Sequence, residues 1–348
     1  MPRAITIENA KRMLRSWTQL RESGSTDREV MGAVASGELI RIRRGWYVDA
    51  AAWQGLWNEG RHLLAVVAVH HDSSYAAPPF CFESAAVIHG LPLYRSAPAV
   101  VHTLVGDTSH SRARAGAARH ALRIAPDDVV EVNGLRCTSV ERTVLDLAQR
   151  MTPEAAVASA DAALRRFAVH EQHQDEARAA AWRDRLLERA AGISTRGIRR
   201  ARRVIAFADG RAQLPGESVS RLQLHRLGFT GVGLQTHVVG PDGEDYWTDF
   251  VFPKARVFGE FDGLGKYLDD ETRRAFNGRD PPRGEAEGGR DSWCHRLAHR
   301  ALGIVTHRLR RTSRGTLGIL RHPPLTPDPP FLPRPISEHV GADGSRRE

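Results

Sequence analysis

Three acidic residues in the carboxyl-terminal third of the chain have the types and the spacing of a metal site. Asp249 precedes the apolar run Phe250–Phe252, and Glu260 and Asp262 end a second apolar run that follows a short turn. Because side chains alternate along a strand, Glu260 and Asp262 point to the same side of the second strand. Neighbouring carboxylates repel one another unless a cation lies between them, and clustered carboxylate oxygens suit Mg²⁺ or Mn²⁺. The pattern therefore predicts a divalent-metal site with these three acids as ligands.

Two more residues with useful chemistry flank the predicted strands. Glu217 lies upstream in the segment Gly216–Arg221, which reads GESVSR, and Lys266 follows Asp262 by four residues. Over residues 214–267 the residue types and spacing resemble the core of the PD-(D/E)XK nuclease superfamily, and more closely its Vsr-like branch, often labelled DUF559. This resemblance covers the acids, the turn between the strands and the basic residue downstream.

The resemblance implies a restriction-endonuclease-like domain with a mixed sheet that hydrolyses nucleic-acid phosphodiesters. On that interpretation Asp249 and Glu260 ligate Mg²⁺, which lowers the pKa of a bound water and stabilises the leaving oxygen. Asp262 is a further ligand or orients the water, Glu217 is an outer ligand, and Lys266 steadies the attacking hydroxide or the phosphate. The alternative for the same residues is a surface hairpin whose acids are only solvated.

A second set of candidate residues lies near the amino terminus. Thr26 and Glu29 have the spacing of a capping box, which predicts the start of a short helix. The segment Gly37–Val48 (GELIRIRRGWYV) alternates apolar and basic residues and turns at Arg44-Gly45, which predicts a basic β-hairpin. An earlier helix is predicted by apolar residues at helical spacing: Ile7, Ala10, Met13, Leu14 and Trp17.

This helix and hairpin resemble the amino-terminal winged helix-turn-helix of AbiEi-type antitoxins. The resemblance implies a DNA-binding domain at residues 1–55, and it makes a cognate toxin a candidate partner. The side chains expected to contact phosphates are Arg28, Arg41, Arg43 and Arg44. The alternative is a small packing domain whose arginines are merely solvated.

Residues 56–150 are expected to form a structural domain, because few of their residues suggest catalysis or ligand binding. A short helix is expected at 83–91 and a strand at 100–105. Asn133-Gly134 is a strong turn signal between strands at 129–132 and 135–138. Ser139 is then a candidate N-cap for the helix that follows. These elements favour an α/β middle domain.

The segment 151–212 is expected to be helical and basic. Alanine is abundant in its first part, and Trp182–Arg203 carries eight arginines. The default interpretation is a solvated linker helix. The sharper alternative is a groove that guides a nucleic-acid backbone.

The nuclease-like core at residues 213–276 is expected to be incomplete, because the resemblance stops after Tyr267. Residues 277–348 are rich in Pro, Arg and Gly, a composition that buries little apolar surface. Two explanations compete: a disordered tail, or a reading frame that shifted near Lys266–Asp280. On the second explanation the acids are present but the last layer of the domain is lost.

The composition of the chain indicates its cellular compartment and the kind of partner it could bind. The chain has 348 residues and a formal net charge of +9, which is compatible with a polyanionic partner. Only three of its 50 basic residues are lysines, so arginine abundance alone is weak evidence for phosphate recognition. Three cysteines in so long a chain favour a reducing cytoplasm, and no apolar run approaches the roughly 20 residues of a membrane span.

These observations predict a multidomain α/β protein: a winged helix-turn-helix, an α/β middle domain with a helical arm, and a nuclease-like domain. The leading hypothesis is a DNA-binding protein with a metal-dependent endonuclease domain that uses Mg²⁺ or Mn²⁺. A rival hypothesis is a non-enzymatic DNA-binding regulator of the AbiEi antitoxin kind, with a degenerate nuclease-like domain. A third is a protein-interaction scaffold with neither activity.

Overall fold

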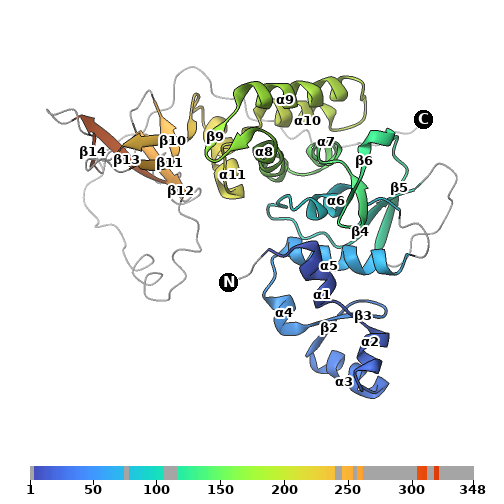
Figure 1. The fold of residues 1–348 in the computed structure, drawn as a ribbon. Helices are drawn as coiled ribbons and strands as arrows, with labels where there is room; N and C mark the ends of the chain where they lie inside the picture. Colours follow the sequence, from blue (N-terminus) through green and yellow to red (C-terminus); the bar gives the residue numbers. More distant parts are fainter. Residues whose placement is uncertain are drawn as a thin grey trace, which may run out of the picture. The chain divides into compact units, whose positions relative to one another are not determined.

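The chain combines helices with several small sheets and divides into two compact units (Figure 1). The computed structural model describes residues 4–73, 78–105, 116–239, 245–253 and 257–261, together with the backbone of 304–311 and 317–320. Unit 1 is Met1–Val219 and unit 2 is Ser220–Glu348. The three amino-terminal segments expected from the sequence therefore belong to one compact unit.

The amino-terminal part of unit 1 places three helices ahead of a hairpin. Its elements are α1 (Ile7–Met13), β1 (Arg15–Ser16), α2 (Trp17–Glu22), α3 (Asp27–Ser36), β2 (Leu39–Arg43) and β3 (Trp46–Asp49). The three strands form one sheet in the order β1-β3-β2. Leu20, Val30 and Tyr47 form the local core. The predicted hairpin and the capping box of Thr26 and Glu29 are both confirmed.

One helix prediction in this part is wrong. The sequence places Ile7 to Trp17 on a single helix, but the backbone becomes extended at Leu14. Ser16 then caps a new helix by accepting a hydrogen bond from the backbone N–H of Gln19. Trp17 therefore starts α2, where it packs on the local core instead of continuing the face of α1.

The middle of unit 1 is built around short strand pairs. Its elements are α4 (Ala50–Gln54), α5 (Asn58–His71), α6 (Phe82–Ile88), β4 (Val101–Leu104), β5 (Ala117–His120), a 3-10 turn (Pro126–Asp128), β6 (Val129–Val132), β7 (Leu135–Thr138) and α7 (Val140–Arg150). Asn133 and Gly134 both have positive φ, 47° and 81°, as a tight hairpin turn requires. The predicted strands, the hairpin and the Ser139 N-cap are confirmed.

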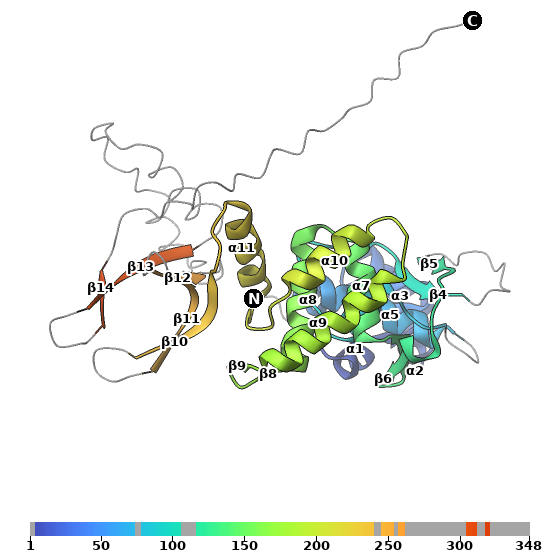
Figure 2. The ribbon, with the colours of Figure 1, turned by 90° about the horizontal axis from the view of Figure 1, so that it is seen from above.

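Four helices form a packed layer at the end of unit 1 away from α2 and α3 (Figures 1 and 2). Added to α7 are α8 (Pro153–Ala168), α9 (Glu176–Ala191) and α10 (Ile198–Phe207), with a small hairpin of β8 (Val169–His170) and β9 (His173–Gln174) between α8 and α9. The interpretation of this segment as a solvated linker differs from the structure. Trp182 is 1% exposed and Leu186 is fully buried, because α9 and α10 pack on α7 and α8.

Unit 2 contains the strands that carry the predicted metal ligands. α11 (Pro215–Arg226) spans the division between the units, and β10 (Gly233–Val239), β11 (Asp245–Phe252) and β12 (Val257–Phe261) follow it. With β13 (Ile304–Arg311) and β14 (Leu317–Leu320) they form a sheet in the order β10-β11-β12-β13-β14.

The described pairs of this sheet are all antiparallel, so the expected mixed sheet is not seen in that part of the chain. Short connections such as those between β10, β11 and β12 permit antiparallel pairing, whereas parallel neighbours need a long crossover. β13 and β14 lie inside the range 277–348 for which the sequence predicts a tail, and the rest of that range lies outside the described residues. Among the described residues, no helix is long and apolar enough to cross a membrane.

Candidate metal site and nucleic-acid surface

Asp249 is held from both sides within the sheet of unit 2. Its strand, β11, lies between β10 and β12. The side-chain Nε2 of Gln235 donates to Asp249 Oδ1 at 3.0 Å, and the backbone N–H of Phe261 donates to Asp249 Oδ2 at 2.7 Å. Each carboxylate oxygen has a second lone pair that can accept or ligate. The two donors therefore fix the carboxylate without exhausting its capacity.

Glu260 lies on β12, the strand next to that of Asp249. The register of β11 and β12 pairs Phe250 with Gly259 and Val251 with Phe258, and Asp249 and Glu260 are the next residues along the two strands, one step beyond the last paired positions. Both acids are half-buried, while Phe250 is fully buried. Two of the three predicted ligands thus lie on adjacent strands of one sheet.

The other three predicted residues of this site are described only in part. Glu217 lies in the first turn of α11, within unit 1, where it is 3% exposed and its Oε2 accepts from the backbone N–H of Gln213 at 2.9 Å. Asp262 and Lys266 lie outside the described residues. In the described part of the chain, no three His, Cys, Asp or Glu side chains form a group that could hold a metal ion. A complete ligand set therefore needs at least one group beyond Asp249 and Glu260.

The four predicted DNA-contacting arginines fall into two kinds. Arg28, in the first turn of α3, and Arg41 and Arg44, in the hairpin, are exposed and make no ion pair within the described residues. Arg43 differs, because its Nε lies 2.7 Å from Asp72 Oδ2 and its side chain is only 18% exposed. The indole Nε1 of Trp46 also donates to Asp72 Oδ1, at 2.7 Å. Asp72 thus anchors the hairpin, a role that its sequence position does not reveal.

The acids beside Arg28 on α3 are bound to other groups, so they do not neutralise its charge by an ion pair. Asp27 Oδ1 is 3.1 Å from Arg21 Nη1, and Glu29 reaches back to the backbone N–H of Thr26. The hydrogen bonds from Thr26 lower the pKa of Glu29. Both acids therefore already have partners.

The arginines of α9 and α10 are mostly committed to the fold. Arg183 donates to the carbonyl of Ala208, Arg200 to that of Ala148, and Arg202 to that of Ala190, at 3.0, 3.3 and 2.8 Å. These carbonyls lie at the carboxyl-terminal ends of α10, α7 and α9, where backbone acceptors lack helical partners. Arg185 and Arg189 pair with carboxylates, Glu141 and Asp128. The guiding groove considered for this segment would have to rely on the other arginines, Arg196, Arg199 and Arg203.

A histidine cluster that sequence reasoning missed lies between α6, β4 and β5. His102 Nδ1 is 2.9 Å from His120 Nε2, and His102 Nε2 is 3.7 Å from Glu83 Oε2. Burial lowers the pKa of His102 and of His120. On the neighbouring α5, burial lowers the pKa of His62 to about 4, and its Nε2 lies 2.9 Å from Ser84 Oγ. These imidazoles are neutral core groups near pH 7.

The two described cysteines are buried, and their thiols do not ionise readily. Burial raises the pKa of the Cys81 thiol far above its ordinary value and raises that of Cys137 to about 12. A thiol must ionise to act as a nucleophile, so neither residue suits that role.

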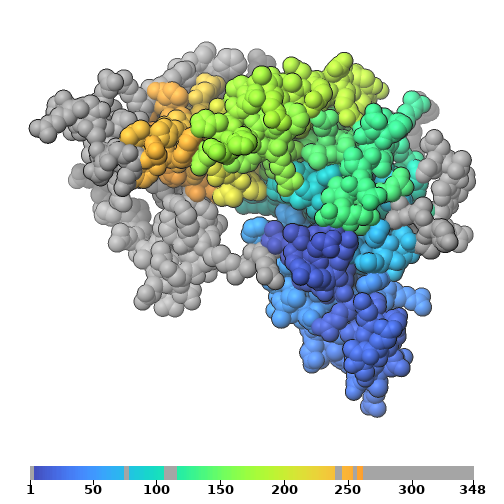
Figure 3. Space-filling view, in the orientation of Figure 1, coloured from blue at the N-terminus to red at the C-terminus, as the bar shows by residue number. Residues whose placement is uncertain are grey.

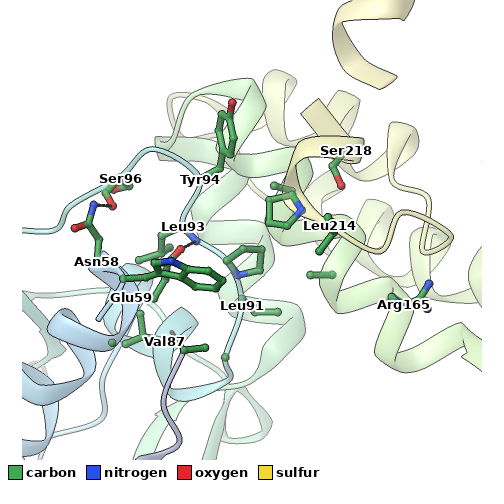
Figure 4. Close-up of a pocket in the computed structure, with 18 of the residues that line it drawn as sticks. Asn58, Glu59, Val87, Leu91, Leu93, Tyr94, Ser96, Arg165, Leu214 and Ser218 are labelled. Atoms are coloured by element: carbon green, nitrogen blue, oxygen red, sulfur yellow. Dashed lines mark hydrogen bonds between the residues drawn. The ribbon is translucent and has the colours of Figure 1, made fainter. Parts of the chain in front are cut away.

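Unit 1 also contains a cavity of about 1060 Å³ beside α5 and α8 (Figure 4). Its lining is largely apolar and includes Leu91, Leu93 and the half-exposed Trp57 and Leu214. Two of the polar side chains that Figure 4 labels are engaged with the backbone: Glu59 accepts from the N–H of Leu93, and Arg165 donates to the carbonyls of Gly210 and Arg211.

Comparison with known proteins identifies relatives without a known activity. No family model matches this chain. It is 32% identical over 150 residues to two Mycobacterium tuberculosis proteins, uncharacterized protein MT2308 of strain CDC 1551 and uncharacterized protein Rv2248 of strain H37Rv. The match covers 41% of this chain, and the chain spans about half the length of these curated relatives, 51%.

Proposed function

We propose that this chain is a DNA-binding protein that contacts duplex DNA through a winged helix-turn-helix formed by α1 to β3. The observation that carries the proposal is the element order helix, strand, helix, helix and hairpin, with the strands arranged β1-β3-β2 and unpaired arginines on α3 and the hairpin. In such a module the last helix enters a groove and the hairpin flanks the backbone.

The positions of the arginines support this assignment. Val30 faces the core from α3, so Arg28, two residues earlier, lies on an exposed part of the same helix. Arg41 and Arg44 are exposed in and beside β2, and Figure 3 shows this amino-terminal surface in dark blue. Guanidinium groups that have no partner in the protein are the ones able to neutralise phosphates.

A second candidate function, metal-dependent phosphodiester cleavage, rests on Asp249 and Glu260. Two carboxylates on adjacent strands suit Mg²⁺ or Mn²⁺, and Asp249 is fixed by donors from both neighbouring strands. Such an ion, once bound, supplies a more acidic water and stabilises charge on the leaving oxygen. The protein's own contribution is to hold the two carboxylates in place. Asp262 and Glu217 are proposed as additional ligands, and Lys266 as the group that steadies the phosphate.

A non-enzymatic regulator of the antitoxin kind remains the alternative to this second function. It needs the amino-terminal arginines but neither Asp249 nor Glu260. The two hypotheses therefore separate cleanly in experiments on the full chain.

DNA binding is tested by the salt dependence of affinity for a duplex. The triple variant Arg28→Ala, Arg41→Ala, Arg44→Ala should lower the slope of log K against log salt by about 2.7, since each phosphate contact contributes about 0.9. A matched control, Arg196→Ala, Arg199→Ala, Arg203→Ala, removes the same charge from α10 and the segment just before it, where these side chains are exposed. Equal slopes for the two triple variants would reject the amino-terminal surface as the contact.

Cleavage is tested with supercoiled plasmid in the presence of Mg²⁺ or Mn²⁺. Nicking should disappear in Asp249→Asn and Glu260→Gln, while DNA binding by the amino-terminal module persists. A parent protein that binds DNA but never nicks it would favour the regulator. Undiminished nicking by Asp249→Asn would reject the assignment of these acids.

A further inference from the structure

Gln235 has an unusual backbone for a strand residue. Its φ is +44°, in the left-handed region that side chains other than glycine rarely adopt. The strand pairing is regular on both sides, with Leu234 opposite Phe250 and Thr236 opposite Thr248, and the position opposite Gln235 is Asp249. The strain is thus located at the residue that faces the candidate metal ligand.

The side chain of Gln235 is also buried, with 7% of the residue exposed. Leu234 beside it is buried too, so the inside–outside alternation of β10 breaks at this point. A buried amide needs partners, and Nε2 of Gln235 donates to Asp249 Oδ1 at 3.0 Å. Backbone strain together with a buried polar contact is a combination found where a site must be held in one geometry.

We propose that Gln235 is a positioning residue that sets the orientation of the Asp249 carboxylate for a divalent cation. This inference rests on the proposed cleavage function and names a residue that the nuclease-like sequence pattern did not include. Gln235 acts on one carboxylate oxygen and the backbone of Phe261 acts on the other, so the group cannot rotate about its terminal bond.

Glutamine is chemically suited to this role. Its amide donates a hydrogen bond but carries no charge, so it does not neutralise the carboxylate that must attract the cation. It also does not titrate, so the orientation of Asp249 is preserved across the pH range in which the acid is ionised. A lysine or arginine in the same place would compete with the metal for the carboxylate.

Two substitutions separate the amide from the strained backbone. Gln235→Met keeps the length of the side chain and removes the donor. Gln235→Gly removes the donor and also relieves the strain, because glycine tolerates positive φ. Thr236→Val, at the next position of the same strand, is the control for a general disturbance of β10.

Metal affinity is measured on the full chain as the Mn²⁺ concentration that half-saturates the rise in melting temperature, with plasmid nicking as a second readout. Both Gln235 variants should require about tenfold more Mn²⁺, which is the usual scale for partners of metal ligands, while Thr236→Val should match the parent. In Gln235→Gly the metal-free melting temperature should not fall below that of Gln235→Met. A purely structural role would instead lower stability and leave the half-saturating concentration unchanged.

The outcomes distinguish this inference from the function beneath it. A parent protein whose melting temperature ignores Mn²⁺ would overturn the metal site and the role of Gln235 together. A parent that responds to Mn²⁺, with Gln235→Met and Gln235→Gly responding at the same concentration, would overturn the role of Gln235 alone.

Discussion

Arginine side chains serve opposite purposes at the two ends of unit 1. On α3 and the hairpin, Arg28, Arg41 and Arg44 are exposed and unpaired within the described residues. On α9 and α10, most arginines are bound to carbonyls at helix ends or to carboxylates, and their partners are Ala148, Ala190, Ala208, Glu141 and Asp128. The same residue type supplies binding capacity in one region and internal cohesion in the other.

The difference shows why arginine content does not by itself identify a nucleic-acid surface. A guanidinium has five donors, so one side chain can satisfy backbone acceptors that a helix end leaves open. Arg166 repeats the arrangement at the end of α6, where it donates to the carbonyls of His89 and Gly90. An arginine used in this way is unavailable to phosphates. Only its contacts in the structure show whether an arginine is bound within the protein or free to bind a phosphate.

The largest effect is expected from removing an arginine that stabilises the packed helices α7 to α10. Arg142 contacts Asp146 through Nε at 3.0 Å and Asp128 through Nη1 at 3.2 Å, and both acids are at least 95% buried. Arg142→Met should destabilise the protein by about 3–5 kcal/mol, because it leaves the buried Asp146 carboxylate without its ion pair and leaves Asp128 with Arg189 alone. The measurement is chemical denaturation. The double variant Arg142→Met, Asp146→Leu should recover part of the loss, and a single variant as stable as the parent would show that the cluster is not cohesive.

The second-largest effect is expected from acid, which should lower the free energy of unfolding of unit 1. Burial lowers the pKa of His62 from 6.5 to about 4, so the unfolded state takes up a proton before the folded state does. Stability is therefore intact above pH 6.5 and falls as the pH drops toward 4, by on the order of 3 kcal/mol for this residue.

Two buried acids modify this acid response in opposite senses. Burial tends to raise the pKa of Asp128, but its bond to Arg189 outweighs burial and leaves the pKa lowered, so its contribution is also lost in acid. Burial raises the pKa of Asp146, which offsets part of the loss. Thermal melts of the parent and of His62→Gln between pH 7 and pH 4 should converge as the pH falls. Parallel curves would show that His62 does not carry the acid sensitivity.

The smallest predicted effect concerns Arg43, the hairpin arginine that behaves like those of the packed region. Asp72→Asn removes its ion pair while keeping an oxygen for the indole N–H of Trp46. A freed Arg43 should add one phosphate contact and steepen the salt slope by about 0.9. The double variant Asp72→Asn, Arg43→Ala is the control. An unchanged slope in Asp72→Asn would mean that Arg43 faces away from the DNA.

Local signals in the sequence were reliable because the groups that produce them are neighbours along the chain. The Thr26 and Glu29 cap, the Asn133-Gly134 turn and the Ser139 cap depend on contacts within three or four residues, and each is present. The alternation that placed Asp249 and Glu260 on strands is of the same kind.

The features that the sequence did not predict depend on contacts between residues far apart in the chain. Asp72 pairs with Arg43 across 29 positions, and Gln235 meets Asp249 across 14 positions. The positive φ of Gln235 is imposed by its neighbours in the sheet, since glutamine has no preference for it. The break between α1 and α2 was missed because Trp17 continues the helical spacing while its side chain packs elsewhere.

The hairpin of β6 and β7 bears on how the molecule avoids aggregation. β6 reads Val-Val-Glu-Val, and no strand pairs with its other side within the described residues. An apolar edge strand of this kind is a template for pairing with a second chain. Glu131 is exposed at its centre, opposite Arg136, and a new strand would have to bury that charge. We therefore expect the Glu131 carboxylate to disfavour the addition of a second chain at this edge.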